Sequence, residues 1–195
     1  ISTGTDNTVI GYNAAIAITT AIQNTAIGAL AADALTTGNY NTAVGYNAMS
    51  AATTGTFNMA FGNQAMGGGV VTGTRNTACG NGALYDLTTG SDNVAVGYDA
   101  SANITTGGSN VAVGRGALDA CTTGDLNVAI GHQALGAQTG QGYNTAVGGN
   151  CMQSNNGGEK CVAVGRQSLY ANTTGSYNVA VGYDALVANT TASSN

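Results

Sequence analysis

Few side chains in this sequence could carry out acid–base, metal or nucleophilic chemistry, and those few are scattered. The 195 residues include one histidine, His132, four cysteines, nine acidic residues and four basic residues. Asp99 and Asp184 hold equivalent places in a repeated pattern, but they stand five repeats apart. The G-G-x-G-x-D signature of calcium-binding rolls is missing. The pattern therefore indicates a protein that is not an enzyme and needs no metal or other cofactor.

The four cysteines occupy four different places in the repeat: Cys79, Cys121, Cys151 and Cys161. They replace a valine, an apolar corner residue, an alanine and an asparagine, as small packing side chains would, and they lack zinc-type spacing. Cys151 and Cys161 lie in successive repeats, and oxidising surroundings would permit a disulfide between them. Disulfides need specific Cα distances that a sequence does not give, so both interpretations stay open.

A repeat seventeen residues long organises the whole chain. It reads N-(T/V)-A-(V/I)-G, then a short apolar pair, then T-T-G, as in "NTAVGYNAMSAATTGTF". With the asparagine counted as position 1, the repeats begin at Asn7, Asn24, Asn41, Asn58, Asn76, Asn93, Asn110, Asn127, Asn144, Cys161 and Asn178. An insertion in "GGGVVTGTR" makes the step from Asn58 to Asn76 one residue longer than the others. We expect a single repeat domain over residues 1–195, and, because neither end resembles a capping repeat, a slice of a longer array.

The composition favours β-strands. The chain has 31 glycines, no proline and no tryptophan, and only 7% of its residues are charged, with a net charge of −5. Its many Val, Ile and Thr residues suit strands, and proline, which removes a ladder hydrogen bond, is missing. No apolar run approaches the ~20 residues of a membrane helix. Four basic residues make nucleic acid an improbable partner, so neither nucleic-acid binding nor membrane insertion of this segment is expected.

Position 5 of the repeat is glycine throughout, which suggests a corner with positive φ or a close backbone approach. These corner glycines are Gly11, Gly28, Gly45, Gly62, Gly80, Gly97, Gly114, Gly131, Gly148, Gly165 and Gly182. A second glycine, usually in T-T-G, marks another corner. Seventeen residues with two or three corners make one coil of a β-solenoid, since a helical-pair repeat needs about 33 residues. We predict an all-β fold: a parallel β-solenoid, or β-roll, of about eleven coils, forming a rod section of roughly 50 Å.

Equal coils place equivalent residues above one another at about 4.8 Å. The asparagines of position 1 are then expected to form a ladder of side-chain amides, interrupted once at Cys161. Its members are Asn24, Asn41, Asn58, Asn76, Asn93, Asn110, Asn127, Asn144 and Asn178. The stacked threonines, such as Thr88 and Thr89, form either a similar column or simple turns.

Both faces of the strand are apolar, which is typical of strands buried on both sides. Position 4 is apolar in every repeat, and position 3 is alanine in ten of the eleven. We expect position 4 to point inside the coil and the alanines to form an exposed stripe larger than monomers usually tolerate. Association along that stripe, through residues such as Ala95 and Ala112, would cover it. The alternative is a lone solenoid.

The repeats "NVAVGYDA", "NTAVGYNA" and "NTAIGALA" resemble the head repeats of trimeric autotransporter adhesins of the YadA type. They resemble still more closely the 17-residue arrays of phage tail-fibre proteins that end in a self-cleaving chaperone domain. This resemblance covers essentially the whole chain. It implies a parallel, left-handed β-roll in a homotrimeric fibre, located outside the cell on a virion or a bacterial surface.

Tyrosines are the most prominent candidates for a ligand surface. Tyr46, Tyr98 and Tyr183 follow the corner glycine, and other aromatic residues precede position 1. Such residues could form a discontinuous aromatic stripe that holds a glycan or a partner protein, or they could simply pack on the glycine corners. Ice binding is disfavoured because the paired threonines are adjacent and point to opposite sides of an extended strand, so they do not form a flat T-x-T face.

We therefore expect a structural fibre segment that spaces or presents an attachment function. Its partners would be further copies of itself, as a trimer or an end-to-end filament, and a host-surface glycan or protein. The alternative is a glycan- or receptor-binding adhesin module that uses its own tyrosine-bearing surface.

Overall fold

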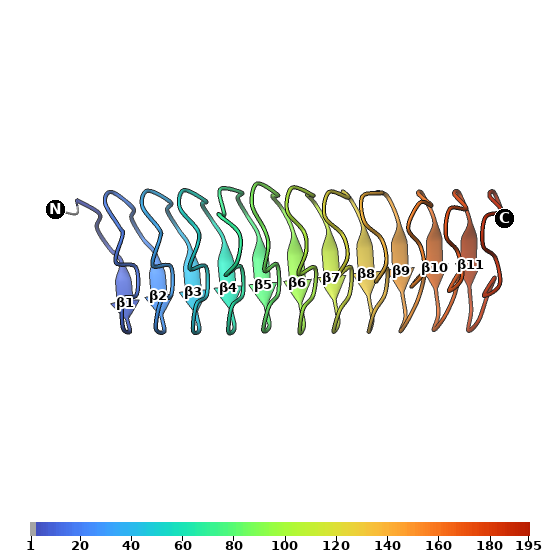
Figure 1. Ribbon diagram of the computed structural model, residues 1–195, viewed down its shortest axis with the longest axis horizontal. Helices are drawn as coiled ribbons and strands as arrows, with labels where there is room; N and C mark the ends of the chain where they lie inside the picture. The colour runs from blue at the N-terminus through green and yellow to red at the C-terminus, as the bar shows by residue number, and fades with distance from the viewer. Residues whose placement is uncertain (1–2) are drawn as a thin grey trace.

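The computed structural model describes residues 3–195, which form one rod of stacked coils with the two termini at opposite ends (Figure 1). Each coil contributes one strand of three residues. The strands are β1 (Thr8–Ile10), β2 (Thr25–Ile27), β3 (Thr42–Val44), β4 (Met59–Phe61), β5 (Thr77–Cys79), β6 (Val94–Val96), β7 (Val111–Val113), β8 (Val128–Ile130), β9 (Thr145–Val147), β10 (Val162–Val164) and β11 (Val179–Val181). They pair in chain order in a single parallel sheet. The predicted all-β parallel solenoid is confirmed.

The sheet keeps one register throughout, including at the long repeat. Ala26 pairs with Ala43, one regular repeat further along the chain, and Ala60 pairs with Ala78 across the repeat that has the extra residue. The extra length is taken up outside the sheet, where Val70 is 55% exposed and Val71 is buried. The insertion therefore leaves the pairing of the strands unchanged.

Left-handed backbone conformations close each coil within so short a repeat. Besides the corner glycine, three further positions, numbers 7, 9 and 17, have positive φ in every regular coil; in coil six these are Asp99 (φ 49), Ser101 (φ 49) and Ser109 (φ 58). Such a conformation costs a residue other than glycine of order 1 kcal/mol or more. Hydrogen bonds to the next coil offset this cost: the Leu118 N–H donates to the Ala134 carbonyl at 2.9 Å, for example.

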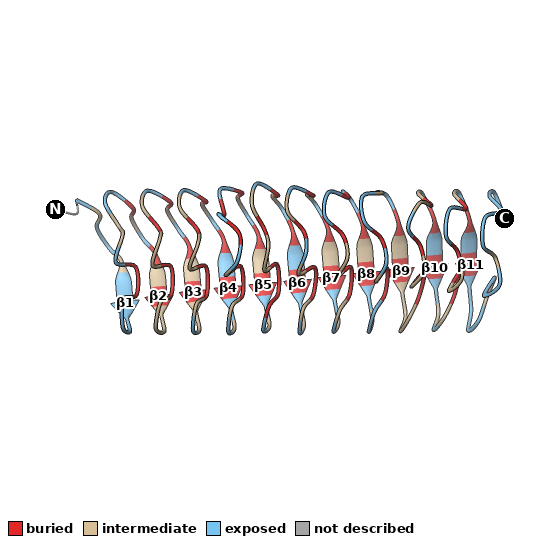
Figure 2. Cartoon of the chain, viewed as in Figure 1, coloured by how far each residue is buried: buried red, intermediate tan, exposed pale blue. Residues whose placement is uncertain are grey.

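The strand faces the other way from our expectation: the alanines of position 3 are inside, and position 4 is outside (Figure 2). Ala95 and Ala112 are fully buried, whereas Val96 and Val113 are 37% and 36% exposed. The prediction of an inward position 4 and an exposed alanine stripe was wrong. The coil is thin, and in most coils its interior already holds an alanine at position 8 and a leucine or methionine at position 9. Only a small side chain fits opposite them, because protein interiors pack at crystal-like density.

Candidate functional site

The predicted asparagine ladder is present and buried. Asn110 donates its side-chain amide to Asn93 Oδ1 at 3.0 Å and to the Gly124 carbonyl at 2.8 Å. Its own Oδ1 accepts the backbone N–H and the side-chain amide of Asn127, at 3.0 and 3.1 Å. Each asparagine thus satisfies backbone groups of its own coil and of the adjacent one. These residues hold coils together, and their burial keeps them out of reach of a ligand.

Cys161 replaces one asparagine and supplies a weaker version of the same contacts. Its backbone N–H donates to Asn144 Oδ1 at 3.0 Å, and its Sγ lies 3.3 Å from the Gly175 carbonyl. All four cysteines are free, so the structure does not contain the conceivable Cys151–Cys161 disulfide. Burial raises the pKa of the Cys121 and Cys151 thiols to about 11, so neither is a reactive thiolate near neutral pH.

A second amide ladder, which the sequence analysis missed, runs through the last coils. Position 12 is apolar in the early coils but holds Gln138, Asn155, Asn172 and Asn189 in coils eight to eleven. Asn172 donates its side-chain amide to Asn155 Oδ1 at 3.0 Å and accepts that of Asn189 at 3.1 Å. The change from leucine-like residues to amides at one position was the available signal. This ladder is also structural, because its first three members are buried.

The two glycines of the repeat have different roles. Gly97, at the first corner, has a φ of +136°, and a Cβ there would lie 2.7 Å from the backbone of Gly114. Gly107, from T-T-G, is buried and has no positive φ, but a Cβ would collide with the Gly124 carbonyl of the next coil. The first corner therefore needs glycine for both conformation and space. The second corner favours glycine for space but is less strict, because Ala21, Gln141 and Ala192 occupy the equivalent position in other coils.

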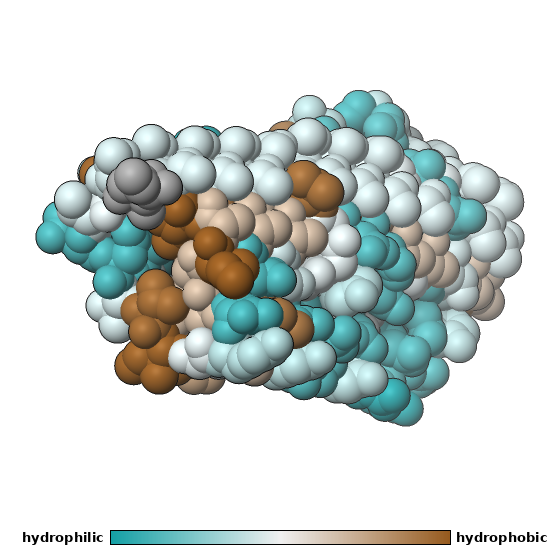
Figure 3. All heavy atoms as spheres, turned by 60° about the vertical axis from the view of Figure 1, so that its left-hand side comes forward, coloured by the Kyte–Doolittle hydropathy of each residue, from teal (hydrophilic) through white to brown (hydrophobic). Residues whose placement is uncertain are grey.

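The outer face of the sheet is apolar and uncharged along the whole rod. It consists of positions 2 and 4, which hold only Thr, Val, Ile, Met, Phe and Cys. Its large members include exposed residues such as Val94 at 36% and Val181 at 70%, and half-buried residues such as Val44. Hydrophobic side chains also gather at the N-terminal end of the rod, which comes forward in Figure 3. Ten steps of about 4.8 Å make the outer face about 48 Å long.

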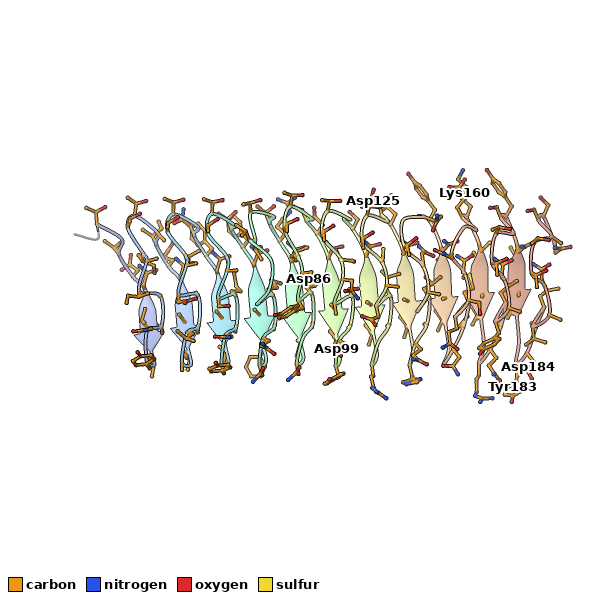
Figure 4. All side chains as sticks on the ribbon, viewed as in Figure 1. Asp86, Asp99, Asp125, Lys160, Tyr183 and Asp184 are labelled. Atoms are coloured by element: carbon orange, nitrogen blue, oxygen red, sulfur yellow. The ribbon has the colours of Figure 1, made fainter. Side chains whose placement is uncertain are left out.

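The tyrosines predicted as a ligand surface are exposed, but the structure does not bring them together. Tyr46 and Tyr98 stand three coils apart, about 14 Å, and Tyr98 and Tyr183 five coils apart, about 24 Å. Asp99 and Tyr183 lie on the same edge of the rod, far apart along it (Figure 4). Tyr183 accepts a hydrogen bond from Arg166 at 2.7 Å, and Arg115 lies 5.9 Å from the ring centre of Tyr98. Tyr98 and Tyr183 thus each contact an arginine of an adjacent coil.

A shallow polar groove crosses the side of the coils away from the sheet, and sequence reasoning did not find it. Its largest part is an open depression of about 670 Å³, with Gly136 and Ala137 among its lining residues and Asp119 and Tyr170 at its ends. Two smaller depressions adjoin it, and Asp119 lines both of them as well. Position 10 links these residues, since in coils five to ten it holds Tyr85, Ala102, Asp119, Gly136, Gln153 and Tyr170. That alternation of large, acidic and small residues was the missed signal.

Asp119 is the most perturbed acid in the groove. Burial raises the pKa of its carboxyl above the usual value, and the nearby charge of Asp99 raises it further, while a hydrogen bond from Asn103 acts in the opposite direction. The Asn103 side chain donates to Asp119 Oδ1 at 3.2 Å and to the Asp119 carbonyl at 2.9 Å. His132 lines one of the smaller depressions but is itself exposed.

Among residues 3–195, no group of three or more His, Cys, Asp or Glu side chains could hold a metal ion. The described part of the chain also has no helix long and apolar enough to cross a membrane. No protein-family model, no curated protein and no solved structure matches this chain.

Proposed function

We propose that the chain is a section of a structural fibre, in which parallel copies associate through the outer sheet face and space or present an attachment function on a virion or cell surface. The observation that carries this proposal is the uncharged, apolar outer face that runs over all eleven strands. Its flat area, about 48 Å by about 10 Å, reaches the size of the largest apolar patches that monomers expose. The side chains project from the sheet, so the accessible apolar area is larger than this flat area. Covering the face removes that area from water, which is favourable.

A second copy of the same chain is the partner that fits this face best. The face repeats the same contact at every coil, and only a surface with the same spacing can match it at each level. An identical parallel chain has that spacing by construction. No charged side chain occurs at positions 2 or 4, so two such faces meet without repulsion. We propose three chains per fibre because the repeats resemble those of trimeric fibres.

The proposal assigns the array a mechanical role and no catalysis. Stability in a stacked array accumulates from contacts between neighbouring coils, which suits a stiff spacer. The alternative prediction, binding of a glycan or receptor by the chain's own tyrosine-bearing surface, lacks a common site for Tyr46, Tyr98 and Tyr183, and only Tyr98 lines depressions of the polar groove.

Sedimentation of two matched double variants tests the interface. The wild-type protein should sediment with three times the chain mass of 19.0 kDa. Val96→Arg with Val113→Arg should fold as a monomer, because both side chains already point outward. Ala95→Arg with Ala112→Arg should not fold, because it buries two charges in the core. A wild-type protein that remains monomeric at high micromolar concentration would contradict the proposal.

Cys79 provides an internal reporter of the same face. It occupies position 4 of β5 and is the one exposed cysteine among the four. In the assembled wild-type protein its reaction with a maleimide should be slowed at least tenfold relative to the Val96→Arg, Val113→Arg variant. Equal labelling rates in the assembly and the monomer would place the contact on another face.

A further inference from the structure

We propose that the polar groove centred on Asp119 binds a short neutral oligosaccharide. This site is independent of the proposed fibre contact, because it lies on the coil residues across the core from the outer sheet face. The groove would stay open in a fibre held together by its sheets.

The shape of the groove comes from departures from the repeat at position 10. Ala102 and Gly136 leave the wall low on either side of Asp119, and Tyr85 and Tyr170 raise it five coils apart, about 24 Å. The ring of Tyr85 lies against Gly68, where a Cβ would come within 2.5 to 2.8 Å of ring carbons. This contact holds the ring as a fixed end wall. The main depression of about 670 Å³ falls in the size range of small-ligand sites.

The lining matches the chemistry of sugar hydroxyls, each of which both donates and accepts a hydrogen bond. Gln133, Gln153 and Asn156 present amides with the same dual capacity, and Thr173 and Thr174 add hydroxyls. The Gln153 side chain donates to Gln133 Oε1 at 3.1 Å, so the two amides are already oriented across the floor.

Two features narrow the chemical class of the ligand further. A tyrosine ring at the end of a polar depression packs against the C–H face of a sugar ring while its hydroxyl stays hydrated. Asp99 and Asp119 face the groove, and Arg115 is the one lysine or arginine among its lining residues, so with His132 neutral an anionic glycan would meet net negative charge. A neutral chain of a few sugar rings satisfies both conditions.

Filling the floor gives the sharpest test. Gly136→Tyr should block the depression without unfolding the coil, because Tyr85 and Tyr170 occupy the same position of the repeat. Gly136 has no positive φ, and a Cβ there approaches no atom closer than 3.2 Å. Asp119→Ala removes the central acceptor. Asp184→Ala is the matched control for Asp119→Ala, because it removes an aspartate outside the groove. Tyr183→Ala is a second control, because it removes an exposed tyrosine that does not line the groove.

The wild-type protein is first applied to a printed array of neutral and anionic oligosaccharides, and the best neutral glycan is then titrated by calorimetry. We expect both groove variants to weaken binding at least tenfold and both controls to stay within twofold. Binding of no neutral glycan, binding of anionic glycans alone, or unchanged affinity in Gly136→Tyr would overturn the proposal. Sedimentation of Gly136→Tyr, expected to match the wild type, keeps this outcome separate from that of the fibre proposal.

Discussion

At the scale of the residue, the coil depends on backbone conformations that most side chains avoid. The non-glycine residues with positive φ cluster between 46° and 64°, and the corner glycines lie between 130° and 144°. The first group is strained but accessible to residues such as Asn, Asp and Leu. The second lies in a region that is essentially restricted to glycine.

Replacement of Gly97 by valine should therefore be among the most damaging single changes. It combines backbone strain at φ +136° with contacts of 2.7 Å to the backbone of Gly114. We expect a loss of at least ~3 kcal/mol in the free energy of unfolding, measured by urea denaturation.

Gly149→Ala is the control for this experiment. Gly149 has no positive φ, and a Cβ there would meet nothing within 4 Å. Its substitution should change the free energy of unfolding by no more than about 0.5 kcal/mol. Similar losses for both variants would mean that φ at the corner does not limit stability.

At the scale of the element, the sequence predicted the strand, its position and its neighbours, but not which side faced inward. Alternation shows that Val94 and Val96 share one face and Ala95 takes the other. It does not show which face is inside, because both are apolar. The width of the coil decides which face lies inside. That width depends on Leu118 and its equivalents, whose side chains enter the core from a left-handed backbone conformation. A sequence does not display that conformation for leucine.

The second amide ladder allows a prediction about coupled side chains. Asn172→Leu alone should lower the free energy of unfolding by about 1–3 kcal/mol, because Asn155 and Asn189 lose a buried partner. Leucine in all four ladder positions, at Gln138, Asn155, Asn172 and Asn189, should cost no more than the single change. Position 12 is already leucine at Leu35 and Leu87, so the backbone accepts it.

Thermal and urea unfolding of the single and quadruple variants measure this coupling. The backbone carbonyls that the ladder serves keep other donors, as Gly158 does from Asn144. A quadruple cost near four times the single cost would show that the four amides stabilise the coils independently.

At the scale of the whole molecule, the regular part of the sequence predicts the rod, and the irregular part creates the groove. The repeat predicted the number of coils, the parallel register and the asparagine ladder. The groove depends on which departures from the repeat fall on nearby coils, such as Asp119, Gly136 and Tyr170. Those departures do not recur with the period of the repeat, so the depression that they form becomes visible only in the stacked structure.

Removal of one whole repeat should leave a shorter, folded rod. Deletion of residues 41–57 joins Tyr40 to Asn58, and Asn24 Oδ1 then meets the backbone N–H of Asn58 as it now meets that of Asn41. We expect a rod shorter by about 4.8 Å with an unchanged groove, checked by X-ray scattering and circular dichroism. Deletion of residues 41–49 alone removes half a coil and should prevent stacking beyond that point. Equal folding of both deletions would contradict nearest-neighbour stacking.

The extra residue of the fourth coil shows where this rod accepts foreign sequence. The chain bulges at Val70 while β4 and β5 pair in the same register as every other pair of strands. A peptide epitope inserted beside Val70 would therefore be displayed at a fixed height on a rigid shaft. Choosing an equivalent corner in another coil would move the epitope along the shaft in steps of about 4.8 Å, so the array can serve as a graduated scaffold for arranging antigens or enzymes.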